Sequence, residues 1–321
     1  MSENMLPFRR IEISDRPWVM ERLKKSDFMG CEYTFGNNFI WRNSHNIQVL
    51  DFKGFCFLKS KYAYTYPAGD GDIKEAIEAL ILDAQLRKTP FVLRGVTVEN
   101  LEILNDIFPN YFDYEDARDE SDYVYLSEKL STLSGKKLQS KRNHISRFKD
   151  NPNWIYEPIN EDNITDCYEF GLDWYKANVS NKNDNLQKEY SAVLQAFRSF
   201  SDLKFDGGLI RREGKVVAFS MGEPLNSDTY VIHIEKADPN IQGAYPMINQ
   251  QFVINNCREF KYINREDDAG DIGLRKAKLS YGPEIMLTKY RLKLKELFIY
   301  DITSNQRDGQ GTYGDLEEVL R

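Results

Sequence analysis

Apolar and polar residues alternate in two short runs near the start of the chain, at 47–52 and 54–59, and this period of two predicts a β-hairpin. Apolar residues then recur at helical spacing over 72–87, which predicts an amphipathic helix. The other elements predicted in this part are helices at 16–24 and 99–107, a strand at 90–93, and a strand pair at 111–116 and 123–126. Together these elements predict one α/β unit.

The same two periods organise the second half of the chain. Alternating runs at 208–212, 215–221 and 229–236 predict antiparallel strands, with a tight turn at 213–214 between the first two. The remaining predicted elements are helices at 131–149, 164–176, 189–200, 246–260 and 273–280, and strands at 261–264 and 286–294. We therefore expect two α/β domains, at 1–128 and 129–300, and a polar C-terminal tail at 301–321.

Composition places the chain among globular proteins, with 41% hydrophobic and 29% charged residues in a length of 321. Because no apolar run is long enough for a bilayer and the first residues do not form a signal peptide, we expect a cytoplasmic protein without a transmembrane segment. The four cysteines lack CxxC spacing, so neither a disulfide framework nor a metal site is predicted. A net charge of −7 argues against a surface that coats nucleic acid, but it allows a local basic patch.

The segment 262–281 concentrates acids, glycines and bases in one strand, loop and helix. Three carboxylates stand together at 266–268, and Gly270 and Gly273 allow tight turns or close approach to a ligand. Helical spacing then places Lys278 on the apolar side of the following helix. A lysine there either extends along a packed stem to solvent or faces a polar cleft, and the neighbouring acids and glycines favour the cleft.

The predicted helix at 131–149 holds six Lys or Arg and no acid over its basic part. Its apolar stripe contains Lys141, with Arg142 at the margin of the stripe. One interpretation is a solvated basic helix. The other is recognition of phosphate, in a nucleic-acid backbone or in a cofactor pyrophosphate.

The strand at 229–236 places His233 and Glu235 on one face, close enough to perturb each other's protonation, which general-base chemistry could exploit. A cross-strand or surface pair is the alternative. The residues before the next predicted helix are Gln242, Gly243 and Ala244. The free N–H groups of that helix could hold an anion, although a glycine there also fits a plain turn.

The sequence contains no GxSxG, HExxH, Walker or GxGxxG motif in its expected context. No covalent nucleophile is therefore indicated. A mechanism of direct attack by an acceptor amine or hydroxyl requires the fewest special residues, because the protein then supplies only orientation and charge.

Four segments together carry a family resemblance: LSGKKLQSKRNHISRF, the strand with Glu235, IQGAYPMINQQF and INREDDAGDIGLRKAKLSYGP. They resemble the uncharacterised bacterial proteins related to the C-terminal domain of phosphatidylglycerol lysyltransferases, over nearly the whole chain. The resemblance implies an α/β fold of two tandem GNAT-like acyltransferase domains with mixed sheets flanked by helices. These are similar to the Fem-type aminoacyltransferases, which take an aminoacyl group from charged tRNA.

The resemblance implies a transferase that moves an aminoacyl group from aminoacyl-tRNA, or an acyl group from acyl-CoA, to an amine or hydroxyl acceptor. We expect no tightly bound cofactor, and we expect tRNA and a small-molecule or peptide acceptor as partners. A non-catalytic module that binds a small anionic metabolite or an RNA end is the alternative.

The residues proposed for this chemistry fall into three groups. The catalytic candidates are Glu235, His233 and Tyr281. The substrate-binding candidates are Lys141, Arg142, Asn264, Glu266, Arg275 and Lys278. The cofactor-binding candidates are Gln242, Gly243 and Ala244. We expect Lys141, Glu235 and Lys278 to converge on one pocket, where they pair with each other or line a wet cavity, because unpaired buried charges are costly.

Overall fold

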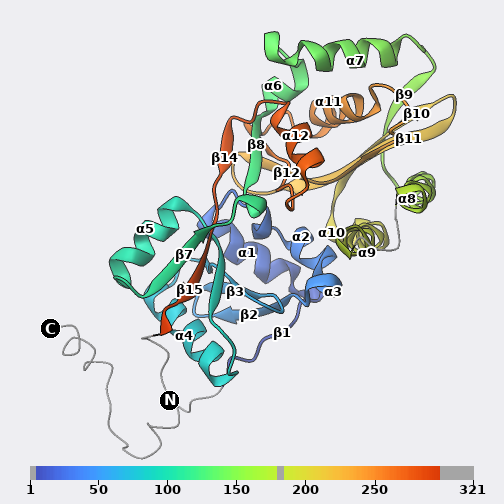
Figure 1. Ribbon diagram of the computed structural model, residues 1–321. Helices are drawn as coiled ribbons and strands as arrows, with labels where there is room; N and C mark the ends of the chain where they lie inside the picture. The colour runs from blue at the N-terminus through green and yellow to red at the C-terminus, as the bar shows by residue number, and fades with distance from the viewer. Residues whose placement is uncertain (1–4, 179–183, 297–321) are drawn as a thin grey trace, which may run out of the picture.

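Two mixed β-sheets with helices packed against them make up the computed structural model, which describes residues 5–178 and 184–296 (Figure 1). The strand order is β1-β2-β3-β4-β6-β15-β7 in the first sheet, with β5 beside β3, and β14-β8-β13-β12-β11-β10-β9 in the second. This confirms the predicted α/β class, with mixed sheets flanked by helices. The predicted tail at 301–321 lies outside the described residues.

The first sheet follows the predicted local pattern. Its strands are β1 (Arg9–Arg10), β2 (Gln48–Phe52), β3 (Phe55–Lys59), β4 (Tyr64–Thr65), β5 (Ala68–Gly69), β6 (Val92–Val96), β7 (Phe112–Asp116) and β15 (Tyr290–Leu294). Its helices are α1 (Arg16–Ser26), α2 (Phe35–Ile40), α3 (Arg42–His45), α4 (Ile73–Leu86) and α5 (Val98–Ile107). The predicted hairpin is confirmed, because β2 and β3 pair antiparallel from Gln48 opposite Lys59 to Phe52 opposite Phe55.

The second sheet carries the longest strands. They are β8 (Asp122–Leu126), β9 (Trp154–Pro158), β10 (Asp206–Arg212), β11 (Lys215–Pro224), β12 (Thr229–Ala237), β13 (Tyr262–Asn264) and β14 (Ile285–Leu287). The helices here are α6 (Ser127–Thr132), α7 (Gln139–Lys149), α8 (Ile164–Asn178), α9 (Asp184–Arg198), α10 (Phe200–Leu203), α11 (Ala244–Asn256) and α12 (Ile272–Leu279). Among the described residues, no helix combines the length and apolarity that a bilayer crossing needs.

The predicted strand pair at 111–116 and 123–126 is wrong, because β7 belongs to the first sheet and β8 to the second. The predicted strand at 286–294 is also wrong, since it divides into β14 in the second sheet and β15 in the first. The β7–β8 and β14–β15 segments run together between the two sheets (Figure 1). Sheet membership therefore does not follow a single cut in the sequence.

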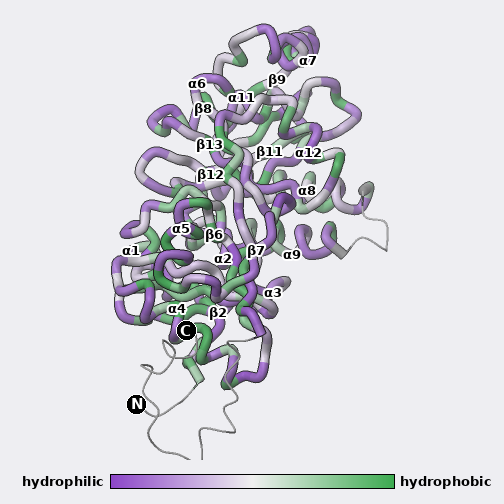
Figure 2. Tube along the Cα trace, turned by 60° about the vertical axis from the view of Figure 1, so that its left-hand side comes forward, coloured by the Kyte–Doolittle hydropathy of each residue, from purple (hydrophilic) through white to green (hydrophobic). Residues whose placement is uncertain are grey.

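The predicted helix at 131–149 is broken into α6, a 3-10 turn at Lys136–Leu138 and α7. The break follows from Leu133 and Gly135, which have φ angles of 52° and 90° and cannot continue a right-handed helix. The predicted packing stripe of α7 is confirmed, since Ile145 and Phe148 are buried. Figure 2 shows the rest of α7 as mainly hydrophilic, at one end of the molecule.

The parallel strands β12 and β13 part at their carboxyl ends. They pair only from Thr229 opposite Tyr262 to Val231 opposite Asn264, whereas β12 continues to Ala237. Ligands in α/β sheets bind at such carboxyl-end openings. This opening is where the segments singled out in the sequence meet.

Candidate functional site

Glu235 and Arg265 form an ion pair where β12 and β13 part. Arg265 Nη2 donates to Glu235 Oε1 at 2.8 Å, and Asn249 Nδ2 on α11 donates to Glu235 Oε2 at 2.9 Å. Both charged side chains are only 11% exposed. Burial alone lowers the pKa of Arg265, but the charge of Glu235, the nearby tyrosines Tyr125 and Tyr281 and the hydrogen bond to Glu235 together outweigh burial and raise that pKa above its ordinary value. Arg265 therefore remains a cation inside the opening.

Two cations lie close to the Tyr281 ring beside this ion pair. The Arg265 guanidinium carbon is 4.8 Å from the Tyr281 ring centroid, and Lys141 Nζ on α7 is 4.1 Å from the same centroid. Burial, and then the charge of Arg265, lowers the pKa of Lys141. Burial also raises the pKa of Tyr281, which keeps its hydroxyl protonated. The structure thus brings Lys141, Glu235 and Tyr281 to one place, which we call the Glu235 pocket and define by these three residues with Arg265 and Asn249.

Two atoms of the Glu235 pocket are buried without a hydrogen-bond partner in the described part of the chain: Arg265 Nη1, a donor, and Asn249 Oδ1, an acceptor. Leaving a buried polar group unsatisfied costs roughly 1–3 kcal/mol. A bound group that offers an acceptor and a donor together would satisfy both atoms.

Sequence reasoning missed both residues that carry these atoms, although each leaves a signal. Arg265 is a lone base before three acids. Asn249 interrupts an apolar helix face and is fully buried beside Met247 and Ile248.

Lys278 supports the Glu235 pocket without entering it. Its Nζ donates to the carbonyl oxygens of Arg265 at 2.6 Å and Glu266 at 3.3 Å, and also to that of Asp267. Burial lowers the pKa of Lys278. Because the Lys278 ammonium donates to three carbonyl oxygens of one loop, it fixes the loop that carries Arg265. Three charged residues were expected to converge. Lys141 and Glu235 do lie in the Glu235 pocket, whereas Lys278 binds the loop after β13 that carries Arg265.

His233 contacts Glu266 and Glu223 and not the expected Glu235. Its Nδ1 lies 2.7 Å from Glu266 Oε1 and its Nε2 lies 3.1 Å from Glu223 Oε1, and its side chain is 0% exposed. The register of β11 and β12 shifts here, with Met221 opposite Ile234 and Gly222 opposite Ile232. His233 is thus the extra residue of a bulge, which redirects side chains. In the described residues the expected contact between His233 and Glu235 is not formed.

The two glutamates keep the His233 imidazole protonated and positively charged. Burial alone lowers the pKa of this imidazole, but the hydrogen bonds that it donates to Glu223 and Glu266, together with the charges of these glutamates, outweigh burial and raise the pKa to about 9. Both ring nitrogens therefore donate. Helix α2 completes the group, because Gly36 N–H donates to Glu223 at 3.0 Å and Asn37 Nδ2 donates to Glu266 at 2.9 Å.

Three other predicted residues bind protein groups elsewhere. Asn264 Nδ2 donates to the Met29 carbonyl and to Asp122 Oδ2, both at 2.8 Å. Arg275 binds Asp268 with two hydrogen bonds, of 2.9 and 2.8 Å. Arg142 donates to the carbonyls at the break before α7, that of Gly135 at 2.9 Å. These contacts hold loops in place.

The residues Gln242, Gly243 and Ala244 lead into α11, which begins at Ala244. Gly243 has a φ of 87°, and a Cβ on it would lie 2.2 Å from the His144 carbonyl oxygen of α7. Only glycine fits there, because both the backbone conformation and the contact exclude a side chain. Helix α7 therefore packs directly against the start of α11.

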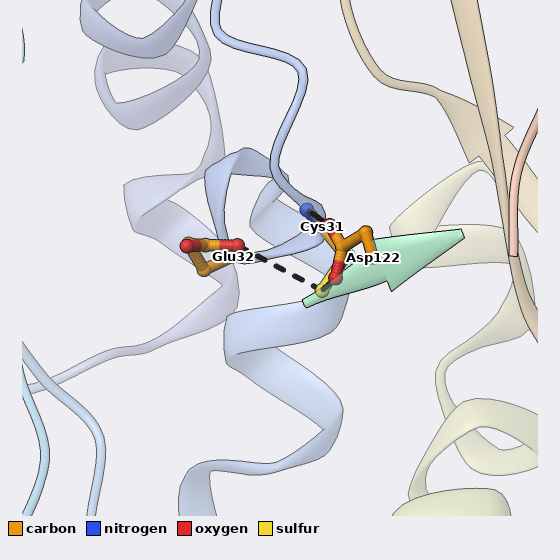
Figure 3. A group of neighbouring side chains, drawn as sticks. All are labelled: Cys31, Glu32 and Asp122. Carbon is orange, nitrogen blue, oxygen red and sulfur yellow. Dashed lines mark hydrogen bonds between the residues drawn. The ribbon is translucent and has the colours of Figure 1, made fainter. Parts of the chain in front are cut away.

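One buried cluster between the sheets has the atom types of a metal site (Figure 3). Ligand atoms of Cys31, Glu32 and Asp122 all lie within 4.8 Å of one another. However, Lys289 Nζ donates to Glu32 Oε2 at 2.6 Å and to Asp122 Oδ1 at 2.8 Å. The Lys289 ammonium thus occupies the position of a cation, and we interpret the cluster as an internal ion pair.

Asp267 lies beside this cluster and titrates near neutrality. Burial, and then the charge of Asp122, raises the pKa of Asp267 to about 7, although Lys289 and Lys278 oppose the shift. Its Oδ1 accepts from the Ala269 N–H at 2.9 Å. Asp267 therefore lies in the loop after β13 with Lys278 and Asp122 as charged neighbours.

A family model described as "Phosphatidylglycerol lysyltransferase, C-terminal" matches residues 23–293. A crystal structure of a conserved protein of unknown function from Bacteroides thetaiotaomicron has 39% sequence identity and a TM-score of 0.87, covering 91% of this chain and 100% of that chain. The structure of L-PGS from Bacillus licheniformis has a TM-score of 0.55 at 13% identity, covering 84% of this chain and 94% of that chain, and it shares the fold.

A curated relative, an uncharacterised protein of Mycoplasmoides gallisepticum, is 28% identical over 195 residues. The match covers 57% of this chain and 59% of the relative. The chain therefore spans less than two thirds of that relative's length.

Proposed function

We propose that this protein, which belongs to the family of phosphatidylglycerol lysyltransferase C-terminal domains, transfers an aminoacyl group from aminoacyl-tRNA to an amine or hydroxyl acceptor. The observation that carries the proposal is the unpartnered donor and acceptor in the Glu235 pocket. An aminoacyl ester offers a carbonyl oxygen as acceptor and an ammonium group as donor, a short distance apart. Arg265 Nη1 would donate to the carbonyl, and Asn249 Oδ1 would accept from the ammonium.

The reaction follows from these contacts. An acceptor amine attacks the ester carbonyl carbon, the new C–N bond forms, and the bond from that carbon to the ribose oxygen breaks. Arg265 stabilises the oxyanion that develops in the transition state, where a preorganised donor is worth roughly 3–4 kcal/mol. The Lys141 ammonium, whose pKa is lowered, donates a proton to the leaving ribose oxygen and is reprotonated by the attacking nitrogen, which becomes acidic once the C–N bond has formed.

Glu235 acts in this scheme as a positioning residue. Both of its oxygens already accept hydrogen bonds, one from Arg265 and one from Asn249. These bonds aim the unpartnered atoms of both neighbours into the pocket. Tyr281 provides the ring on which the two cations lie.

A binding experiment tests the donor side. The probes are bulk tRNA, charged or uncharged, and amide-linked 3′-aminoacyl adenosines, which do not hydrolyse. We expect charged tRNA to bind more tightly than uncharged tRNA. Replacing Asn249→Leu should remove that difference, whereas the control Asn255→Leu, on the exposed side of the same helix, should keep it. Equal affinity for charged and uncharged tRNA would refute the proposal.

A transfer experiment separates an enzyme from a binding module. Labelled aminoacyl-tRNA is incubated with the protein and with pooled amines, peptides or phospholipid vesicles as acceptors. Label that moves to an acceptor with wild-type protein, but not with Arg265→Lys, supports transfer. Tight binding of charged tRNA with no movement of label would instead support a non-catalytic module.

A further inference from the structure

A second polar site lies on the first sheet, formed by residues that the Glu235 pocket does not use. Helix α3, the turn before β4, strands β6 and β15 and the start of α9 surround a cavity of about 710 Å³. This volume lies in the range of small-molecule sites. Ser44 Oγ donates to the Lys188 carbonyl at 3.3 Å, and Lys61 N–H donates to the His45 carbonyl at 3.0 Å, so α9 and the turn are both tied to α3. We call this cavity the α3 groove.

The α3 groove is strongly cationic in a chain of net charge −7. Its wall contains five lysines or arginines and one acid, Glu120. Arg291 and Lys293 have acidic partners, since Arg291 pairs with Glu120 and with Glu115, and Lys293 lies 3.7 Å from Glu115. The other three bases are Lys61, Arg94 and Lys188. None of these three has an ion-pair partner among residues 5–178 and 184–296.

The unpaired bases face a common space. Burial, and then the charges of Arg94 and Lys188, lowers the pKa of His45, so both cations act on the same imidazole. The register of β15 on β6 places Lys293 beside Val92, on the strand face that also carries Arg94. At the groove's edge, the Tyr62 side chain is 77% exposed, and Lys61 Nζ lies 5.0 Å from its ring centroid.

We propose that the α3 groove binds a nucleotide phosphate, with its base against Tyr62. Three cations without acidic partners, converging on one cavity, repel each other until a multivalent anion enters. Phosphate oxygens satisfy lysine and arginine donors, and an exposed tyrosine ring stacks on a nucleobase. The ligand is either a free nucleotide or the phosphorylated end of an RNA strand. This binding does not depend on the transfer reaction proposed above.

Calorimetric titration of the full chain tests the groove with inorganic pyrophosphate, ADP, and an RNA octamer with or without a 5′-phosphate. We expect ADP to bind more tightly than pyrophosphate, and Tyr62→Ala to remove that advantage. The double variant Lys61→Gln with Lys188→Gln should weaken ADP binding on the order of tenfold, since each lost charged contact weakens binding. Both side chains are exposed, so the fold should tolerate this variant.

The control is Lys24→Gln with Lys215→Gln, which makes the same charge change at exposed positions outside the groove. Unchanged ADP affinity in the control supports a specific site. Tighter binding of the phosphorylated octamer than of ADP identifies an RNA end, and equal or weaker binding identifies a free nucleotide. The proposal is overturned if none of the phosphate probes binds, or if the control weakens binding as much as the groove variant.

Discussion

Raising the pH from 6.5 to 9 should lower the free energy of unfolding, because the buried imidazolium of His233 loses its proton over this range. The pKa of His233 is raised to about 9 in the folded chain from an ordinary value of 6.5. A base with a raised pKa binds its proton more tightly when folded. Its contribution to stability is therefore complete below pH 6.5 and is lost as the pH rises through 9.

The magnitude follows from the two pKa values. The interval from 6.5 to about 9 corresponds to about 3 kcal/mol, at about 1.4 kcal/mol for each pH unit. Most of this stabilisation belongs to Glu223 and Glu266, which flank the ring. A loss of this size is a large part of the stability of an ordinary domain, roughly 5–15 kcal/mol.

Urea unfolding from pH 6 to pH 9.5 measures the effect. Wild-type protein should lose about 3 kcal/mol of unfolding free energy relative to His233→Gln over this range. Asp267, with a pKa of about 7, is present in both proteins, so its change of charge cancels in the comparison. His144→Gln is the control. Parallel pH profiles of wild type and His233→Gln would refute the assignment of a buried imidazolium.

Three further predictions concern the Glu235 pocket, the loop after β13 and the basic segment before α7. Glu235→Gln should cost about 3 kcal/mol of unfolding free energy by denaturant titration, because it leaves Arg265 charged and buried, and an unchanged stability would contradict the ion pair. Lys278→Met should cost about 2 kcal/mol and speed hydrogen exchange in residues 265–268, since carbonyls lose their donor; normal exchange would argue that the loop is fixed otherwise. Lys136→Gln with Lys137→Gln should lower the slope of log affinity against log salt for tRNA by about one to two units, and an unchanged slope would leave that end of the basic segment out of the interface.

Local periodicity determined most individual elements of this protein. The hairpin of β2 and β3 and the helix α4 form close to where the sequence predicted them, because their patterns depend on neighbouring residues alone. The break between α6 and α7 was missed, because helical spacing of apolar residues does not reveal the positive φ at Leu133. The sequence also did not reveal that β8 joins the second sheet and β15 the first, since strand pairing depends on residues far apart in the sequence.

The sequence by itself predicted that Lys141, Glu235 and Lys278 meet at one site, because charged groups at apolar positions need partners or water. Only the tertiary structure decided which partners they have. Asn249 and Arg265 reach Glu235 from α11 and from the loop after β13, and Lys278 turns to the backbone of that loop. His233 turns to Glu223 and Glu266 because a bulge redirects it. Residue types and spacing specify which charges must be satisfied, but the packing of distant segments determines where each charge is satisfied.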